Sequence, residues 1–498
     1  MQNSHSQQLP IVYVCGYAST QQDVESRVSD PFYGFNTGSA HIRVGDQGIP
    51  KKFFFESPLI RLMTDYEYRP ILDYQQFVNE EFGNRNAQYL SDRIKKLKDP
   101  LKSIWIYRFY DITSESFGSD QAVRLEVEQI ADGLKKLITD VKQATTANKV
   151  YLVAYSMGGL ICRSLIQKIY PENNEKAEDH IDKFFTYGTP HGGINSQIAG
   201  ALFDQLTNFL EWNNIDDFNP QRMFKYFTPT NQLNNPALSN SDEFKPQSLE
   251  GTFPVDRVFS LIGTNAKDYE EGLGISQRLV GLQSDGLVQI DKAYVKGSHR
   301  AYIYRSHGGR YGMVNSESGF ENLQRFLFGN IKAKISLIGV DKELLNREDT
   351  FYQMEVRFSI RGLPVAIHEQ TIEHNSPINI KMEDLQKEHI PLFTAFFMSD
   401  RSATGDDTCR YLLHMCFHSF RKRQDWLFNE HIENMPIWSD RLLVDTKMID
   451  GKQTATYSWR SVDLEPKYQF TSEIPLPANG QKELGQQAAI HLDISQWK

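Results

Sequence analysis

The chain has 498 residues, of which 40% are hydrophobic and 23% are charged, and this composition is typical of a folded protein, which excludes a disordered chain. At about 150 residues per domain, the length predicts two or three domains. The net charge of −9 and the lack of a long Lys/Arg stripe argue against a nucleic-acid partner. No apolar run reaches the roughly 18 residues of a transmembrane helix.

The first ten residues are polar and carry neither the basic nor the apolar region of a signal peptide. We therefore expect a cytoplasmic protein, with secretion by a route that needs no cleaved signal as the alternative. Four cysteines are too few for a disulfide framework. Cys15 and Cys162 lie in apolar stretches and are expected to be buried thiols.

Strand-like and helix-like segments alternate through the first 330 residues, which predicts an α/β domain built on a mostly parallel sheet. The expected strands are Ile11–Val14, Ile104–Tyr110, Val150–Ala154, Phe184–Tyr187, Val258–Ile262 and Ala301–Arg305. The expected helices are an amphipathic stretch from Val123 to Val141, the segment Met157–Ile169, and a last helix capped by Asn315-Ser316.

Two segments of this region, 17–103 and 194–257, are far longer than a usual connection of about 2–6 residues. In the second, Leu206, Phe209 and Trp212 share one helical face. This face either packs on the core or belongs to a helical lid that covers an apolar site. We predict a lid or cap insertion at 194–257, with these three side chains contacting substrate.

Beyond Asn330 the apolar residues alternate with period two, for example from Tyr352 to Ile360, and Asp450-Gly451 fits a hairpin turn. We therefore expect a catalytic domain at 1–330 and a separate, mostly antiparallel β-sandwich at 331–498. The β-sandwich is a candidate for binding a protein partner.

A serine nucleophile is predicted at Ser156. The apolar strand Val150–Ala154 runs through Ala154-x-Ser156-x-Gly158 directly into a helix, which is the strand–turn–helix setting of a nucleophile elbow. Small residues flank the serine because the turn is sharp. The elbow places the Met157 N–H at the start of the helix, where it can stabilise an oxyanion.

A serine nucleophile needs a base and an orienting carboxylate, which follow it in the order acid, then histidine, on this kind of fold. Asp285 lies in the tight loop Ser284–Val288, and His307 directly follows the strand Ala301–Arg305. His299 precedes that strand and should lie at the opposite end of the sheet. His191 comes before the acid and is expected to shape the wall of the site.

Three motifs resemble the lipase branch of the α/β-hydrolase superfamily, which includes bacterial triacylglycerol lipases and PGAP-type (GPI-inositol-deacylase-like) lipases. They are Tyr155-Ser-Met-Gly-Gly159, Tyr187-Gly-Thr-Pro-His-Gly-Gly193 and Ser284-Asp-Gly-Leu-Val288. The resemblance covers about residues 10–330. It implies Ser156 as nucleophile, Asp285 as acid and His307 as base, with backbone N–H groups of Met157 and Tyr17 forming the oxyanion hole. These lipases usually have His-Gly after the first strand, where this chain has Cys15-Gly16.

The chemistry of a serine nucleophile requires no cofactor, and none is expected. His414, Cys416 and His418 alternate along one predicted strand and would face the same side. No fourth ligand is evident, so we predict no metal site there.

These features predict a serine carboxylic-ester hydrolase, lipase- or phospholipase-like, that acts on lipid esters at a membrane or micelle surface through an acyl-enzyme. Three alternatives remain. They are a secreted antibacterial phospholipase effector whose β domain binds a partner, a thioesterase or amidase, and a hydrolase fold that binds without catalysis.

Overall fold

The computed structural model describes residues 8–16, 39–44, 50–55, 58–71, 94–107, 126–194, 220–233, 244–267, 283–308, 311–345, 350–381, 388–398, 409–424, 430–449, 452–462 and 472–497. The chain divides into two compact units. The α/β unit contains residues 1–300 and 305–320, and the β unit contains residues 301–304 and 321–498.

A seven-stranded sheet, in the order β4-β5-β1-β6-β7-β8-β9, forms the centre of the α/β fold. Every neighbouring pair from β4 through β8 is parallel. The strands are β1 (Ile11–Val14), β4 (Arg69–Ile71), β5 (Ser103–Tyr107), β6 (Val150–Tyr155), β7 (Ile181–Tyr187), β8 (Val258–Gly263) and β9 (His299–Ile303). The predicted α/β fold with a mostly parallel sheet is confirmed, and each expected strand is present within a few residues.

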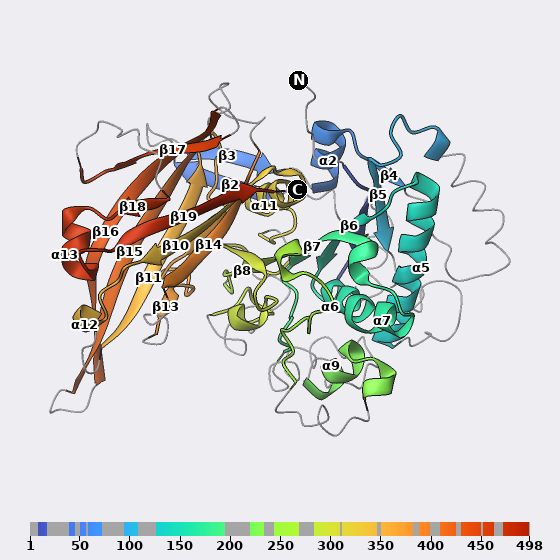
Figure 1. The fold of residues 1–498 in the computed structure, drawn as a ribbon, viewed down its shortest axis with the longest axis horizontal. Helices are drawn as coiled ribbons and strands as arrows, with labels where there is room; N and C mark the ends of the chain where they lie inside the picture. The colour runs from blue at the N-terminus through green and yellow to red at the C-terminus, as the bar shows by residue number, and fades with distance from the viewer. Residues whose placement is uncertain are drawn as a thin grey trace. The chain divides into compact units, whose positions relative to one another are not determined.

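Two helices cover one face of this sheet, and Figure 1 shows them side by side. They are α5 (Val127–Thr145) and α6 (Gly158–Ser164), the latter continued by a π-helical turn at Leu165–Ile169 and the short α7 (Tyr170–Glu172). Apolar residues of α5 recur at three- and four-residue steps, so they form one buried stripe. This stripe packs with the inward side chains of β1 and β6 in a single hydrophobic core.

Several shorter elements complete the α/β unit. The antiparallel hairpin β2 (Ser39–Val44) and β3 (Pro50–Phe55) precedes α2 (Pro58–Tyr66) in the first long segment. Helix α11 (Glu317–Phe328), which begins in this unit and ends in the β unit, starts as the sequence predicts: the Ser316 hydroxyl accepts a hydrogen bond from the Gly319 N–H at 3.0 Å.

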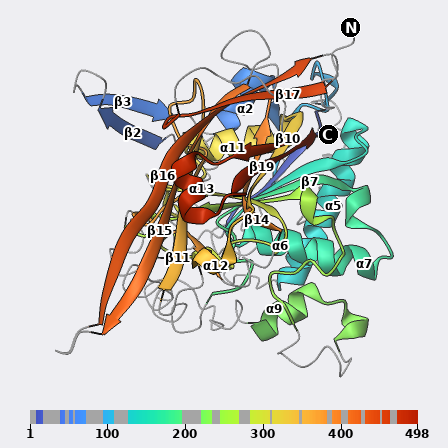
Figure 2. The same ribbon diagram turned by 60° about the vertical axis from the view of Figure 1, so that its left-hand side comes forward.

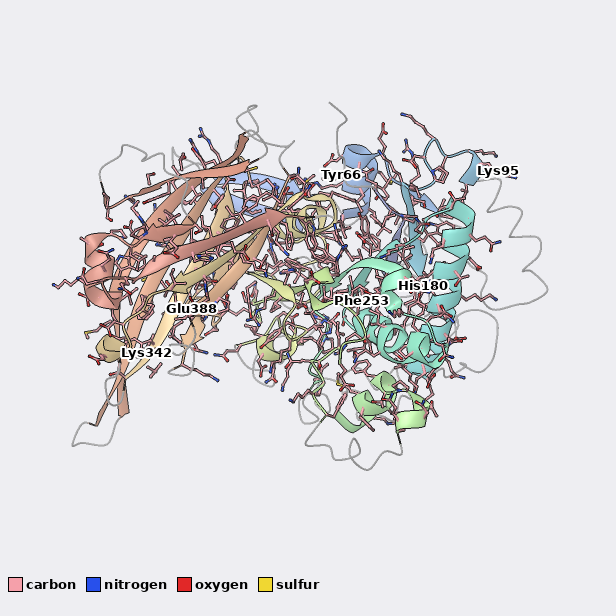
Figure 3. The ribbon with its side chains drawn as sticks, viewed as in Figure 1. Tyr66, Lys95, His180, Phe253, Lys342 and Glu388 are labelled. Atoms are coloured by element: carbon pink, nitrogen blue, oxygen red, sulfur yellow. The ribbon has the colours of Figure 1, made fainter. Side chains whose placement is uncertain are left out.

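The described parts of the segment 194–257 pack on the core of the α/β unit. Helix α9 (Pro220–Phe227) buries Met223 and Phe227, and the returning chain buries Leu249 and Phe253, the latter labelled in Figure 3. Full burial of one such side chain is worth about 1.5–3 kcal/mol. Leu206, Phe209 and Trp212 lie outside the described residues, so the lid stays a prediction.

The β unit contains two antiparallel sheets that share one hydrophobic core, as predicted. One has the order β14-β10-β19-β18, and the other has the order β12-β11-β15-β16-β17 with β13 paired to β11. Their strands are β10 (Ile331–Ile338), β11 (Thr350–Ile360), β12 (His368–Gln370), β13 (Ile378–Ile380), β14 (His389–Phe397), β15 (Cys409–Gln424), β16 (Glu430–Ile449), β17 (Lys452–Trp459), β18 (Glu473–Pro475) and β19 (Ala489–Gln496). Two short helices, α12 (Lys342–Leu345) and α13 (Ala478–Leu484), connect them.

Figure 2 shows the long strands β15 and β16 running alongside each other in the larger sheet. Ile449, the last residue of β16, pairs with Lys452, the first residue of β17. Asp450-Gly451 lies outside the described residues, so the hairpin turn stays a prediction.

All four cysteines are free thiols in buried positions, which confirms the expectation for Cys15 and Cys162. Among the described helices, none combines the length and the apolar character needed to cross a bilayer.

Candidate active site

Ser156 lies at the turn between β6 and α6, at the carboxyl end of the central strand. Its φ of 53° is in the left-handed region, which a non-glycine residue occupies at a cost of about 1–3 kcal/mol. The surrounding backbone holds this turn, because the Ser156 N–H donates to the Tyr187 carbonyl at 2.9 Å. A Cβ on Gly158 would lie 2.5 Å from the carbonyl oxygens of Val14 and Cys15, so only glycine lets α6 approach β1 this closely.

The structure brings Ser156, His307 and Asp285 into one hydrogen-bonded row. The Nε2 of His307 lies 3.0 Å from the Ser156 Oγ, and its Nδ1 lies 2.8 Å from the Asp285 Oδ2. Ser156 follows β6, Asp285 lies in the connection between β8 and β9, and His307 follows β9. His299 begins β9 and so lies at the opposite end of that strand from His307.

The loop around Asp285 orients its carboxylate. Oδ1 accepts the N–H groups of Leu287 at 3.0 Å and Val288 at 2.7 Å, so Oδ2 is left to face the imidazole. The main chains are joined as well, because the His307 N–H donates to the Asp285 carbonyl at 2.8 Å. Both Asp285 and His307 are buried, at 1% and 3% exposure, so water competes little for this pair.

Two further contacts position the row, and the sequence analysis did not identify them. The Tyr155 hydroxyl donates to the His307 carbonyl at 3.0 Å, and the two rings lie 5.1 Å apart. The Thr189 hydroxyl donates to the Ser156 carbonyl at 2.9 Å. Both residues lie in the quoted motifs, but their roles depend on loops that are distant in sequence.

Gly188 leaves room for the row beside the end of β7. A Cβ at this position would lie 3.1 Å from both the Asp285 Oδ2 and the His307 Nδ1, and the residue has a φ of 51°. The lack of space for a side chain and the positive φ explain why the motif Tyr187-Gly-Thr-Pro-His has a glycine at position 188.

His191 is fully buried in the loop after β7, where its Nε2 lies 3.1 Å from the Thr186 hydroxyl. Burial, with a contribution from nearby Arg163, holds the pKa of His191 well below its usual range. The imidazole is therefore neutral, and its contact with Thr186 of β7 holds it against the sheet.

Arg163, on α6, connects the loops around the site. It donates to the carbonyls of His191 at 3.0 Å and Ser248 at 2.8 Å, and to the Gln167 side chain at 2.9 Å. Its guanidinium also lies 4.1 Å from the centre of the Phe227 ring. Burial lowers the pKa of Arg163 to about 9, with Glu250 opposing the shift. The arginine thus joins α6, the loop after β7 and the returning end of the segment 194–257.

Of the two residues predicted to form the oxyanion hole, the structure describes Met157. It is the N-cap of α6 and is buried. Its backbone N–H is at the positive end of the helix, next to the serine. Tyr17 lies outside the described residues, and its role stays a prediction. Leu206, Phe209 and Trp212 are outside them too. In chemical terms, the row can activate a hydroxyl nucleophile toward a carbonyl carbon, with a helix-end N–H beside it.

Comparison with known proteins gives one family match. Residues 80–232 match the family model described as palmitoyl protein thioesterase, a stretch that includes Ser156 and ends before Asp285 and His307. No curated protein matches the chain significantly.

Among solved structures, a protein from Listeria innocua is 16% identical, with 64% of this chain and 94% of that chain covered and a TM-score of 0.29. Phospholipase PlaB from Legionella pneumophila is 10% identical, with 86% and 90% covered and a TM-score of 0.37. A putative cell surface hydrolase from Lactobacillus plantarum is 12% identical, with 65% and 90% covered and a TM-score of 0.26.

Likenesses at these scores carry no inference about substrate. The resemblance to α/β-hydrolase lipases and esterases that the sequence motifs indicated is confirmed, with the parallel sheet and the elbow as its structural counterpart.

Proposed function

We propose that this chain is a serine hydrolase that cleaves acyl esters of lipids. The observation that carries the proposal is the hydrogen-bonded row from Ser156 through His307 to Asp285, in which each atom faces the partner that acyl transfer needs. A non-catalytic binding module would have no need of a strained serine turn whose hydroxyl faces a buried histidine.

In the proposed reaction, the Ser156 Oγ attacks the ester carbonyl while the His307 Nε2 takes the hydroxyl proton. The Met157 N–H, with that of Tyr17, stabilises the tetrahedral oxyanion. His307 then protonates the leaving alcohol, and an acyl-enzyme remains on Ser156. Water activated by the same imidazole releases the acid. Asp285 keeps Nδ1 oriented and stabilises the imidazolium without itself being protonated.

A long-chain acyl thioester is the second candidate substrate, favoured by the match of residues 80–232 to palmitoyl protein thioesterases. The same row serves both reactions, because an ester and a thioester differ only in the leaving group and pass through a similar tetrahedral intermediate. We propose that the enzyme recognises both substrates by their acyl chain and not by their leaving group.

Ser156→Ala tests the proposal most directly. We expect the variant to lose about 10⁶-fold in kcat, because a nucleophile acts as a unit with its base. The wild-type protein should also be labelled by a fluorophosphonate probe, and the variant should not. Circular dichroism of both proteins serves as the folding control. A wild-type protein that is neither labelled nor active on any ester would favour the non-catalytic alternative.

A panel of p-nitrophenyl esters of increasing chain length, followed by phospholipids and palmitoyl thioesters, would define the substrate class. A rate that rises with acyl length on both oxygen and sulfur leaving groups supports acyl recognition. Activity confined to thioesters would replace the leading proposal by the second candidate.

The lid remains part of the proposal. Replacing Phe209 and Trp212 by Ser should reduce hydrolysis of aggregated long-chain lipid more than hydrolysis of a short soluble ester, because a lipid surface offers an open lid alternative burial. Equal losses on both substrates would mean that the segment is core packing. Binding of a protein partner by the β domain, and the cellular location, stay predictions.

A further inference from the structure

A second polar cluster lies on the larger sheet of the β unit. Tyr352, Met354 and Val356 of β11 belong to the hydrophobic core, so Glu355 points to the opposite face of the sheet. The same alternation on β15 buries Met415 and Phe417 in the core and turns Cys416 and His418 to that opposite face. The pairing of Glu355 with Cys416 brings the two strands' polar side chains together.

The ligand atoms of this cluster are close enough to share one ion. One oxygen of Glu355, the Cys416 sulfur and a ring nitrogen of His418 all lie within 4.8 Å of one another. The Nε2 of His418 is 3.4 Å from the Oε2 of Glu355. Two ligands with Zn–N and Zn–O bonds of about 2.0–2.1 Å in a tetrahedron are about 3.3–3.4 Å apart. The observed separation therefore already fits a shared zinc ion.

A main-chain N–H orients the carboxylate of this cluster. The other oxygen of Glu355, Oε1, accepts the Ile372 N–H at 2.8 Å, which leaves Oε2 facing His418. Ser439 lies opposite Cys416 in the β15–β16 pair. Outer contacts of this kind orient metal ligands in proteins.

We propose that Glu355, Cys416 and His418 form a zinc site on the β unit. A thiolate, an imidazole and a carboxylate are the three side-chain types that zinc prefers. The Glu355 side chain is 23% exposed, so water reaches the cluster and supplies the fourth ligand. Binding converts the Cys416 thiol to a thiolate, and the proton passes to solvent.

This ligand set differs from the trio that the strand pattern alone placed together. His414 also faces the outer side, but it pairs with Arg357 and Arg441, and its Nε2 lies 3.4 Å from the Ser439 Oγ. Two neighbouring guanidinium groups disfavour a cation beside His414. Glu355, which supplies the missing ligand, comes from another strand and could not be paired with β15 from sequence.

Zinc binding by the full-length chain tests the proposal. The protein is stripped with a chelator under reducing conditions and then titrated with zinc in competition with a chromophoric chelator. We expect one zinc ion per chain whose affinity falls at least about 100-fold in Cys416→Ser and in His418→Ala, since even the loss of an outer contact costs 10–100-fold. His414→Ala is the matched control, because it removes a histidine from the same face of the same strand. We expect this variant to keep the zinc affinity of the wild type.

Cobalt substitution provides the second readout. Cobalt bound to the wild-type protein should show a thiolate charge-transfer absorption that Cys416→Ser abolishes. If Cys416→Ser fails to fold by circular dichroism, Glu355→Gln serves in its place, since the side chain keeps its shape and the zinc affinity should still fall. Equal zinc affinity in wild type and in the folded ligand variants would overturn the proposal. Loss of zinc in His414→Ala to the same extent as in His418→Ala would overturn the proposed ligand set.

Discussion

The Ser156–His307–Asp285 row and the Glu355–Cys416–His418 cluster use similar side chains in different backbone settings. In the α/β unit, His307 lies between a hydroxyl from the turn after β6 and a carboxylate from the connection between β8 and β9. In the β unit, His418 lies beside a carboxylate and a thiol that project from neighbouring strands. Loops can direct one atom to each ring nitrogen, whereas two paired strands place the side chains of one face next to one another.

This difference explains why the two clusters suit different chemistry. Proton transfer needs a histidine whose two nitrogens face two different partners, as in the row Ser156–His307–Asp285. Sharing an ion needs only that several ligand atoms converge within a few ångströms. The strained φ of 53° at Ser156 has no counterpart at Glu355, Cys416 or His418, which lie in strands and have no positive φ.

The largest loss of activity is expected for His307→Ala, which removes the histidine of the catalytic row. Loss of the base should lower kcat about 10⁶-fold, comparable to loss of the nucleophile. His299→Ala is the matched control, since this histidine begins the strand that His307 follows. Ester hydrolysis by both purified variants is the measurement. An inactive His299→Ala together with an active His307→Ala would reverse the assignment of the base.

Asp285→Asn is expected to lower kcat by about 10⁴-fold, because an amide cannot keep the imidazole in the required tautomer. The exposed Asp291, six residues further along the chain, offers a matched Asp→Asn control that should retain activity. Steady-state kinetics of both variants decide the matter. A loss smaller than tenfold for Asp285→Asn would mean that another group orients His307.

Tyr155→Phe tests whether the backbone of His307 needs to be held. Removing the hydrogen bond to the His307 carbonyl, a net contribution of about 0.5–1.5 kcal/mol, should lower kcat about 2- to 10-fold and leave KM unchanged. Tyr170→Phe is the control, because the buried Tyr170 hydroxyl has no hydrogen-bond partner among the described residues. A rise in KM with an unchanged kcat would place Tyr155 in substrate binding and not in positioning.

The smallest effect on activity is expected for substitution of Lys183. This residue lies within strand β7 and its side chain is fully buried. Burial lowers the pKa of Lys183 from 10.5 to about 7, with Asp182 opposing the shift. Between these pH values the unfolded chain holds a proton that the folded chain lacks, so this group's destabilising contribution shrinks as pH rises.

Lys183→Met should therefore be more stable than the wild type below pH 7, and the difference should diminish toward pH 10.5. Denaturant unfolding of both proteins across this range measures it, with ester hydrolysis near the wild-type rate as the control for the site. A stability difference that does not change with pH would show that Lys183 titrates normally in the folded protein.

The sequence by itself determined the fold of the α/β unit and the position of the elbow. Strands such as Ile11–Val14 and Val150–Tyr155 are continuous apolar runs, because a parallel sheet is buried on both faces. Ser156 could be found because the sharp turn after β6 demands small residues at fixed offsets. The order of Asp285 and His307 then followed from the chain order of the fold.

Only the tertiary structure decided which side chains meet across distant segments. The contact of Tyr155 with the His307 carbonyl joins positions 152 residues apart, and nothing in the local pattern of either segment encodes it. Likewise, period-two alternation placed His414, Cys416 and His418 on one face, but the register of β11 against β15 brings Glu355 beside Cys416 and Arg357 beside His414. A strand pattern specifies which face a side chain occupies, whereas its neighbour across the ladder depends on register, which is a property of the folded sheet.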